Sequence, residues 1–225
     1  MKQESSSCAC GGIGYIFDST RMYAKECSCN KVKQYKQIFE KSGISEKIGF
    51  KEFNASDPQI ATAKESAINY VRSFESISAT KRNSIALLGQ SGAGKTHLTL
   101  AIGNNLMSKG IPVLYMSYIE IIPKLKQSIM DAENYQREMS RFKEAPVLLI
   151  DDLFKESKIE STDNRYILEI INYRYNARKP MIISSECFIN DLLMFDEATG
   201  GRIIEMCKDY LVELRGRHLN YRLKI

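Results

Sequence analysis

A glycine-rich segment with one lysine and one threonine has the pattern of a loop that binds nucleotide phosphates. It matches G-x-x-x-x-G-K-[ST] and reads Gly89-Gln90-Ser91-Gly92-Ala93-Gly94-Lys95-Thr96. Glycines let backbone N–H groups surround a phosphate, the Lys95 ammonium suits the β- and γ-phosphates, and the Thr96 hydroxyl suits Mg²⁺. A chance match in a Gly/Ser-rich loop is the alternative. Because an apolar strand-type run precedes the loop and a helix-type pattern follows it from His97, the sequence predicts nucleoside triphosphate binding, with His97 packed beside the loop.

Two adjacent carboxylates follow a fully apolar segment further along the chain. Residues 147–150 are Val-Leu-Leu-Ile, and Asp151 and Asp152 come directly after them. Such a run is typical of a central parallel strand buried on both faces, and ligands bind at the carboxyl ends of these strands. We expect Asp151 to hold Mg²⁺ together with Thr96, and Asp152 to orient a water molecule as general base. An acidic helix cap after a core strand is the alternative for both aspartates.

Polar residues also end a second apolar run. Ser184, Ser185 and Glu186 follow Met-Ile-Ile at residues 181–183. If this strand lies beside the acidic one, a serine there is a candidate for sensing the γ-phosphate, whereas ordinary turn residues are the alternative.

Several arginines near the end of the sequence could act on phosphate charge. Arg202 follows Thr-Gly-Gly and opens a helix-type segment. From there it could reach a nucleotide held by a neighbouring subunit and neutralise charge in the transition state. A surface arginine is the alternative. Arg215, Arg217 and Arg222 lie close together, where each could be a phosphate sensor of the same chain or part of a basic tail.

Four cysteines near the start form two Cys-x-Cys pairs, Cys8 with Cys10 and Cys27 with Cys29. Four thiolates from two such pairs could enclose a tetrahedral zinc ion. A metal would also stabilise a segment of about 50 residues that has little core of its own. Free or redox-active thiols are the alternative.

The chain around these residues alternates between strand-type and helix-type patterns. Strand-type runs occur at residues 84–88, 113–117, 147–151, 181–185 and 211–214, and helix-type patterns at 60–77, 95–107, 118–142, 162–177 and 201–207. This alternation predicts an α/β fold with a parallel sheet covered by helices on both faces. Asp57 and Pro58 have the residue types of a helix N-cap and a first helical position. We therefore divide the chain into a small cysteine-rich module, residues 1–56, and a nucleotide-binding domain, residues 57–225.

Composition is that of an ordinary globular protein, with 44% hydrophobic and 26% charged residues in 225. No apolar run approaches the length of a membrane span, and residues 1–7 are polar, so we expect a cytoplasmic protein without membrane contact. The net charge of +5 favours a polyanionic partner only weakly.

Four segments together resemble one family. They are the phosphate loop, residues 147–154 with their Asp-Asp-Leu-Phe ending, Ile-Ile-Asn-Tyr-Arg-Tyr at 170–175 and Leu-Arg-Gly-Arg at 214–217. The chain resembles the AAA+ helicase loaders of the DnaC/DnaI type, which include the IstB transposition helpers, over residues 58–225. The Asp-Asp-Leu-Phe ending is similar to the DnaI and phage-type branch. The Cys-x-Cys-Gly-Gly-Ile-Gly-Tyr-Ile start is similar to the cysteine-bearing amino-terminal region of such loaders.

The resemblance implies an AAA+ P-loop core with a five-stranded parallel sheet. It makes residues 89–96 Walker A and Asp151 and Asp152 Walker B. It also makes Arg202 the arginine finger, Arg222 the sensor 2 arginine and Ser185 the residue near sensor 1. The family's Thr-Ser-Asn at that strand end is Ser184-Ser185-Glu186 here. Because 23 residues follow Arg202 (225 − 202), a helical lid domain cannot fit.

The resemblance implies an ATP-hydrolysing DNA replication factor that loads a replicative helicase onto single-stranded DNA and self-associates when ATP is bound. An IstB-like helper of a transposase is the alternative. A metabolic kinase lacks support because no acceptor pocket or arginine-bearing lid is visible, and a DNA-binding adaptor with a vestigial nucleotide site is a further alternative. Single-stranded DNA contact has weak support from four basic residues, Lys124, Lys126, Arg137 and Arg141.

Overall fold

A five-stranded parallel sheet forms the centre of the molecule. This computed structural model describes residue 10 and residues 15–18, 23–155 and 164–223. The strands are β3 (Ile85–Gly89), β4 (Val113–Ser117), β5 (Val147–Asp151), β6 (Met181–Ser185) and β7 (Leu211–Leu214), in the spatial order β4-β5-β6-β3-β7. All neighbouring pairs are parallel, so the predicted fold class and all five predicted strands are confirmed.

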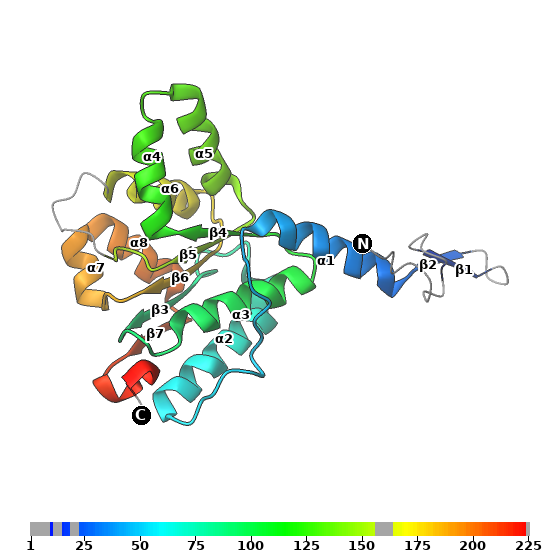
Figure 1. The fold of residues 1–225 in the computed structure, drawn as a ribbon, viewed down its shortest axis with the longest axis horizontal. Coiled ribbons are helices and arrows are strands. Elements are labelled where there is room, and N and C mark those ends of the chain that lie inside the picture. The colour runs from blue at the N-terminus through cyan, green and yellow to red at the C-terminus, as the bar shows by residue number, and fades with distance from the viewer. Residues whose placement is uncertain (1–9, 11–14, 19–22, 156–163, 224–225) are drawn as a thin grey trace.

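Helices cover both faces of the sheet, as the apolar strand sequences require (Figure 1). Successive residues of a strand point to opposite faces, and in β3 Leu87 packs in one core cluster while Leu88 packs in the other. One face is covered by α2 (Pro58–Ile77) and α3 (Lys95–Ser108). The other is covered by α4 (Tyr118–Ser128), α5 (Ala132–Glu144), α6 (Asn164–Asn176), α7 (Ile189–Phe195) and α8 (Glu197–Cys207).

Two helix predictions need correction. The pattern over residues 118–142 predicts one helix, but the structure has α4 and α5 separated at residues 129–131, because Asp131 caps a new helix by accepting from the Asn134 N–H. The pattern over 201–207 starts too late, since Asp196 caps α8 by accepting from the Thr199 N–H. The short helix α7 was not predicted. Asp57 does cap α2, with Pro58 at its first position.

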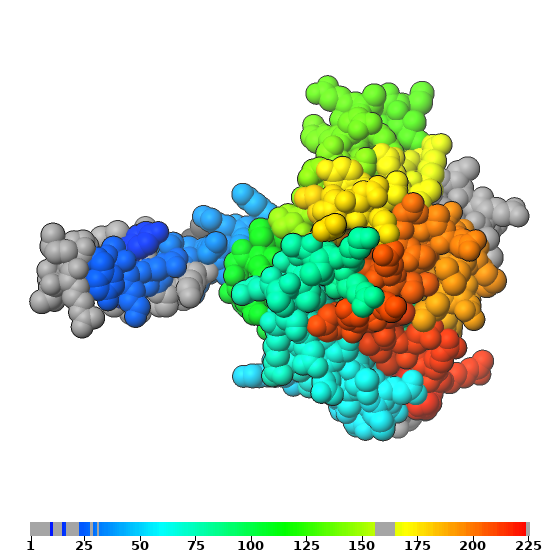
Figure 2. Space-filling view, turned by 180° about the vertical axis from the view of Figure 1, so that it is seen from behind, coloured from blue at the N-terminus to red at the C-terminus, as the bar shows by residue number. Residues whose placement is uncertain are grey.

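The start of the described chain forms an arm. Strands β1 (Tyr15–Asp18) and β2 (Tyr23–Glu26) pair antiparallel, and α1 (Ser28–Ser42) follows them. Figures 1 and 2 show the hairpin standing away from the sheet, while the end of α1 reaches α3 and β4. Neither the hairpin nor α1 was predicted from the sequence.

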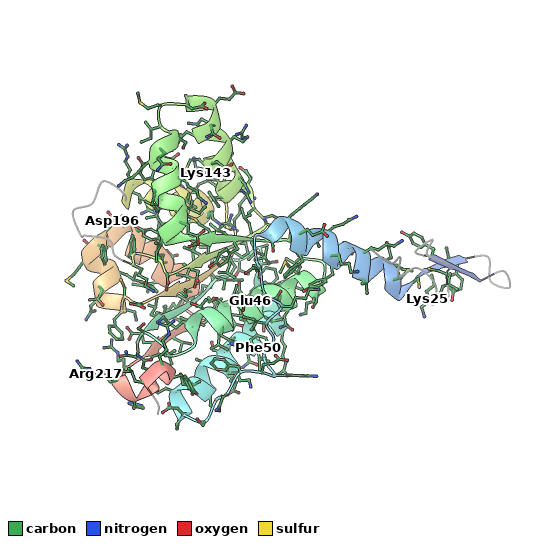
Figure 3. All side chains as sticks on the ribbon, in the orientation of Figure 1. Lys25, Glu46, Phe50, Lys143, Asp196 and Arg217 are labelled. Atoms are coloured by element: carbon green, nitrogen blue, oxygen red, sulfur yellow. The ribbon has the colours of Figure 1, made fainter. Side chains whose placement is uncertain are left out.

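The connection from α1 to α2 packs against the nucleotide-binding domain. Ile44 and Phe53 are buried in the core cluster beneath α2 and α3. The Asn104 amide of α3 donates to the carbonyls of Glu46 at 3.1 Å and Ile48 at 3.2 Å. Figure 3 labels Glu46 on this connection. The boundary between residues 56 and 57 stays a prediction, but residues 44–53 share the core of the larger unit.

After α8 the described chain contains β7 and two short 3-10 turns, η1 (Arg217–Leu219) and η2 (Tyr221–Leu223), and no further α-helix up to residue 223. Across the described ranges, no helix combines the length and apolarity that crossing a membrane requires.

A buried arginine joins three of these elements. The Arg174 guanidinium of α6 donates from Nη1 to the carbonyls of Phe142, Lys143 and Ala145, at 2.9, 3.0 and 2.9 Å. Its Nη2 donates to the Pro180 carbonyl at 2.7 Å. These acceptors lie at the end of α5 and just before β6. Charged donors to carbonyls that lack helical partners thus fix α5, α6 and β6 to one another.

Replacing Arg174 with methionine should destabilise the protein strongly. Four carbonyls would lose a charged donor in a fully buried site, which should lower the free energy of unfolding by at least about 3 kcal/mol. Urea denaturation measures this. Arg82→Met is the control, because Arg82 pairs with Asp209 at the surface with half its side chain exposed, and it should change stability by less than about 0.5 kcal/mol. Equal midpoints for both variants would contradict the assignment.

Candidate nucleotide site

The phosphate loop connects the end of β3 to the start of α3 at the carboxyl edge of the sheet. Gly94, with φ of 86°, is the N-cap of α3, and a side chain there would approach the Phe53 ring to 2.6 Å. No side chain caps this helix; the first intrahelical bond runs from the Leu98 N–H to the Gly94 carbonyl. The first N–H groups of α3 and its dipole are therefore directed at the loop, where an anion is favoured.

Lys95 is folded into the loop. Its Nζ donates to the carbonyls of Gly89 at 2.6 Å and Gln90 at 2.8 Å, and the residue is buried. Burial lowers the pKa of Lys95, and the charges of Glu186 and Asp152 oppose this shift. The ammonium therefore stands at the centre of the loop, where it is poised to meet phosphate oxygens.

Asp151 at the end of β5 joins the loop to the two neighbouring strands. Its Oδ1 accepts from the Thr96 hydroxyl at 3.0 Å and from the Ser184 hydroxyl, and its Oδ2 accepts from the Tyr115 hydroxyl at 3.1 Å. Burial, then the Asp151 charge, raises the pKa of Tyr115, so this phenol stays a donor. The Thr96 hydroxyl and the Asp151 carboxylate are hard oxygen ligands side by side, so these residues fit Mg²⁺. Sequence reasoning missed Tyr115, because nothing in its local pattern shows that β4 lies beside β5.

Asp152 turns back toward the pocket in a left-handed conformation, with φ of 56°. Its N–H donates to the Ser184 hydroxyl at 3.0 Å, and its carboxylate pairs with Lys155 Nζ at 2.9 Å. The hydrogen bond to Asp152 raises the pKa of Lys155. The Lys155 ammonium also lies 3.5 Å from Glu186 Oε1. Ser184 therefore fixes the backbone of Asp152, the residue predicted to orient water. The Asp152 carboxylate is paired with Lys155, which the sequence analysis did not consider.

The two serines of β6 point in different directions. Ser184 contacts Asp151 and Asp152, as described above. Ser185 is buried, donates to the Leu153 carbonyl at 2.6 Å and accepts from the Cys187 N–H at 3.1 Å. The structure thus brings Ser184, and not Ser185, to the acidic pair.

A pocket of about 380 Å³ opens over the phosphate loop. Phe53 and Asn54 line one side of it, and Tyr221 and Arg222 of η2 line another. His97 packs beside the loop as expected, 5.0 Å from the Phe53 ring centroid and with Nε2 3.2 Å from the Gly49 carbonyl. The remaining lining residues are Glu52, Ser91, Gly92, Gly94, Lys95, Thr96, Asp152, Lys155 and Glu186.

The C-terminal turns are fastened to the loop. The Tyr221 N–H donates to the Gly92 carbonyl at 3.0 Å, and its hydroxyl donates to the Asn54 carbonyl at 2.9 Å. Arg222 thereby reaches the pocket, which is where the sequence analysis expected it.

Arg202 lies elsewhere. Its Nη1 donates to the Ala198 carbonyl at 2.9 Å, and its guanidinium lies over the Tyr175 ring at 5.6 Å. It does not line the pocket of its own chain.

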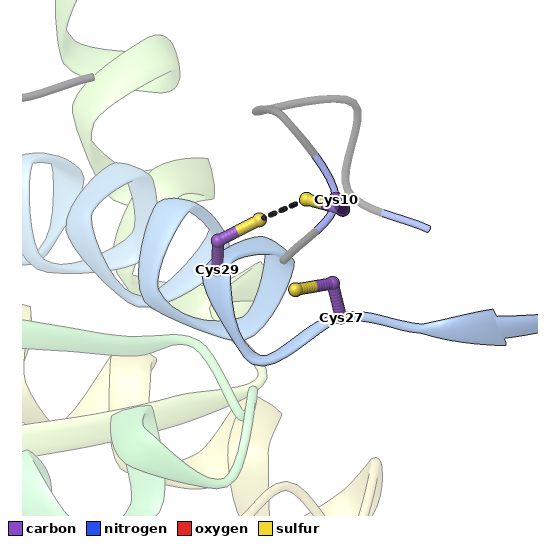
Figure 4. Close-up of side chains that lie close together, drawn as sticks. All are labelled: Cys10, Cys27 and Cys29. Carbon is purple, nitrogen blue, oxygen red and sulfur yellow. Dashed lines mark hydrogen bonds between the residues drawn. The ribbon is translucent and has the colours of Figure 1, made fainter. Parts of the chain in front are cut away.

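Three of the four predicted cysteine ligands meet at the start of α1, next to the hairpin. The sulfur atoms of Cys10, Cys27 and Cys29 all lie within 4.8 Å of one another, and Cys10 and Cys29 are 3.2 Å apart (Figure 4). Zn–S bonds of about 2.3 Å in a tetrahedron separate two sulfurs by about 3.8 Å, so the arrangement is compatible with zinc. Cys8 lies outside the described residues.

Comparison with known proteins assigns the family. Residues 21–202 match the family of IstB-like ATP binding proteins. The chain belongs to this family. It is 42% identical over 210 residues to the phage-like element PBSX protein XkdC of Bacillus subtilis (strain 168), which covers 88% of this chain and 78% of that protein. It is 26% identical over 136 residues to the replicative helicase loader DnaI of the same organism, covering 60% of this chain and 43% of DnaI.

The fold agrees with this assignment. A crystal structure of the DnaC helicase loader superposes with a TM-score of 0.65 and 22% identity, covering 80% of this chain and 99% of that one. The IstB-like chain therefore has an AAA+ P-loop core of the kind found in the helicase loaders. The expected family and fold are confirmed, and ATP binding is the property that the family shares by name.

Proposed function

We propose that this IstB-like protein is an AAA+ ATPase that loads a replicative helicase onto single-stranded DNA. One observation carries the hydrolytic part of the proposal. Asp151 and Asp152 lie at the carboxyl edge of the sheet beside a complete phosphate loop, with the Thr96 hydroxyl 3.0 Å from Asp151. Binding alone needs the loop; a second carboxylate lining the same pocket supplies the base that activation of water needs.

The residues divide the work of hydrolysis as follows. Lys95 and the N–H groups at the start of α3 hold the phosphates and stabilise their charge. Thr96 and Asp151 would hold Mg²⁺, which supplies Lewis-acid stabilisation of phosphate charge when bound. Asp152 orients the attacking water and accepts its proton. Arg222 contacts the nucleotide that its own chain binds. Ser184 fixes both aspartates through its hydrogen bonds to the Asp151 carboxylate and the Asp152 N–H.

Arg202 acts on the site of a neighbouring copy in an ATP-bound oligomer. Its guanidinium is on α8 and does not line the pocket of its own chain, so the phosphate that it contacts is one bound by a neighbouring copy. In this proposal the pocket of one chain is half of the active site, and Arg202 of the neighbouring copy belongs to the other half.

Helicase loading rests on the family relation to DnaI and DnaC, whose names record that role. The cysteine-bearing arm is the part that contacts the helicase, because it stands away from the ATPase core (Figure 1). A transposase helper remains the second candidate, since the matched family is named for IstB. Co-purification of a replicative helicase with the full chain, with and without ATP, distinguishes the two; capture of a transposase instead would overturn the helicase assignment.

Asp152→Asn should separate binding from hydrolysis. The amide cannot accept a proton, so ATP turnover should fall at least about 100-fold, while nucleotide affinity should stay within about threefold because the phosphate loop is intact. Lys95→Ala should abolish binding itself. Steady-state phosphate release and fluorescent nucleotide titration give the two numbers. Full hydrolysis by Asp152→Asn would show that this carboxylate is not the base.

Mixing two inactive variants should test the action of Arg202 across subunits. Arg202→Ala should lose about 1,000-fold in turnover, as loss of an arginine finger does. Asp152→Asn keeps Arg202 and still binds ATP, but its own pocket cannot hydrolyse it. An equimolar mixture should regain part of the activity, because an Arg202→Ala pocket beside an Asp152→Asn neighbour meets that neighbour's arginine. Arg82→Ala, a surface arginine change, should leave turnover unchanged. No recovery in the mixture would count against a role in trans.

Zinc content should follow the arm cysteines. The purified full chain should hold about one zinc ion per chain, and Cys27→Ser or Cys29→Ser should lose it, because a tetrahedral site with three thiolates binds far more weakly. Cys187→Ser, a change remote from the arm, should retain the metal. Elemental analysis of the wild type and the three variants measures this. Zinc-free wild-type protein purified without chelator would refute the site.

A further inference from the structure

Lys155 lies beside the end of β6, where this chain has Glu186 in place of the neutral asparagine that ends the family's sensor strand. Its Nζ is 2.9 Å from Asp152 Oδ2 and 3.5 Å from Glu186 Oε1. All three side chains line the pocket that also contains Lys95 and Thr96. Lys155 is therefore beside the phosphate end of the site, on the loop that follows β5.

The end of β6 is poorly suited to contact a γ-phosphate. The Ser185 hydroxyl is buried and already has both a carbonyl acceptor in Leu153 and an N–H donor in Cys187. The next residue, Glu186, carries negative charge into the pocket and would repel phosphate. Ser185 is thus already hydrogen-bonded at its hydroxyl, and Glu186 has the same sign of charge as the phosphate, so neither is suited to sense a γ-phosphate.

The Lys155 ammonium is a cation of the pocket that can change partners. Asp151, Asp152 and Glu186 bring three carboxylates to this end of the site, and Lys95 is already held by two loop carbonyls. The Lys155 ammonium has three donors on a flexible stem, and its side chain is 29% exposed. It can therefore turn from two carboxylates to a phosphate without unfolding any element.

We propose that Lys155 binds the γ-phosphate in place of the usual polar residue of the sensor strand, and that this exchange frees Asp152 to orient water. The inference rests on the proposed ATPase function. Without a γ-phosphate, Lys155 keeps Asp152 in an ion pair and the base is engaged. With a nucleoside triphosphate, Lys155 moves to the phosphate and the carboxylate is released. A nucleoside diphosphate leaves the ion pair as it is.

The exchange predicts selective loss of triphosphate affinity when the ammonium is removed. In the full chain, Lys155→Gln should weaken binding of the β,γ-methylene analogue of ATP about 10- to 100-fold, the effect of one charge-assisted hydrogen bond. ADP affinity should change less than about threefold, since its phosphates meet the loop only. Lys155→Arg, which keeps the charge, should restore most of the triphosphate affinity. ATP turnover by Lys155→Gln should fall in parallel. Fluorescent nucleotide displacement with Mg²⁺ measures the affinities.

A matched control is available at Lys179. Its Nζ pairs with Glu144 at 3.3 Å and its side chain is 26% exposed, close to the values for Lys155, but it lies outside the pocket. Lys179→Gln should leave both affinities unchanged. Equal binding of the triphosphate by Lys155→Gln and wild type, or an equal loss for ADP, would overturn the inference alone. Wild-type protein that binds neither nucleotide would overturn the proposed function and this inference with it.

Discussion

The Asp151 carboxylate is the interaction on which the rest of the site depends. It accepts hydrogen bonds from the phosphate loop through Thr96, from β4 through Tyr115 and from β6 through Ser184. One buried side chain thus fixes the relative positions of four segments that are far apart in the sequence. A buried carboxylate is costly unless its oxygens are satisfied, and here three hydroxyl donors satisfy them. The same oxygens are the ones that Mg²⁺ would share with Thr96, so the hydrogen bonds that stabilise the fold also preorganise the metal site.

Local patterns were enough to predict the sheet and the phosphate loop. An uninterrupted apolar run such as residues 147–150 indicates a strand that is buried on both faces, as in the centre of a parallel sheet. Lys95 and Thr96 follow from the phosphate-loop pattern, and Asp151 follows from the end of its strand, because parallel strands bring their carboxyl ends to one edge. The break between α4 and α5 escaped the periodicity, since the apolar pattern continues across residues 129–131 and only the capping bond of Asp131 shows the new start.

The residues that escaped prediction are those whose role comes from pairing between distant segments. Tyr115 matters because β4 lies beside β5, and Lys155 because a left-handed turn at Asp152 directs the following residues back to the pocket. Ser184 and Ser185 both end the same strand, and sequence alone gives no means to decide which hydroxyl faces Asp151. Phe53 and Tyr221 meet at the pocket from positions 168 residues apart (221 − 53). No spacing rule within either segment connects them.

The segment between α1 and α2 both follows the arm and lines the nucleotide pocket. It leaves α1 at residue 43, packs Ile44 and Phe53 into the core and passes Asn54 to the pocket before α2 begins. The Asn54 carbonyl accepts from Tyr221, whose N–H holds the phosphate loop at Gly92. The two hydrogen bonds of Tyr221 therefore connect the phosphate loop to the segment that leads to the cysteine cluster. A cut at residue 56 would remove one wall of the pocket together with the arm, so single substitutions in the full chain are the sound way to separate their roles.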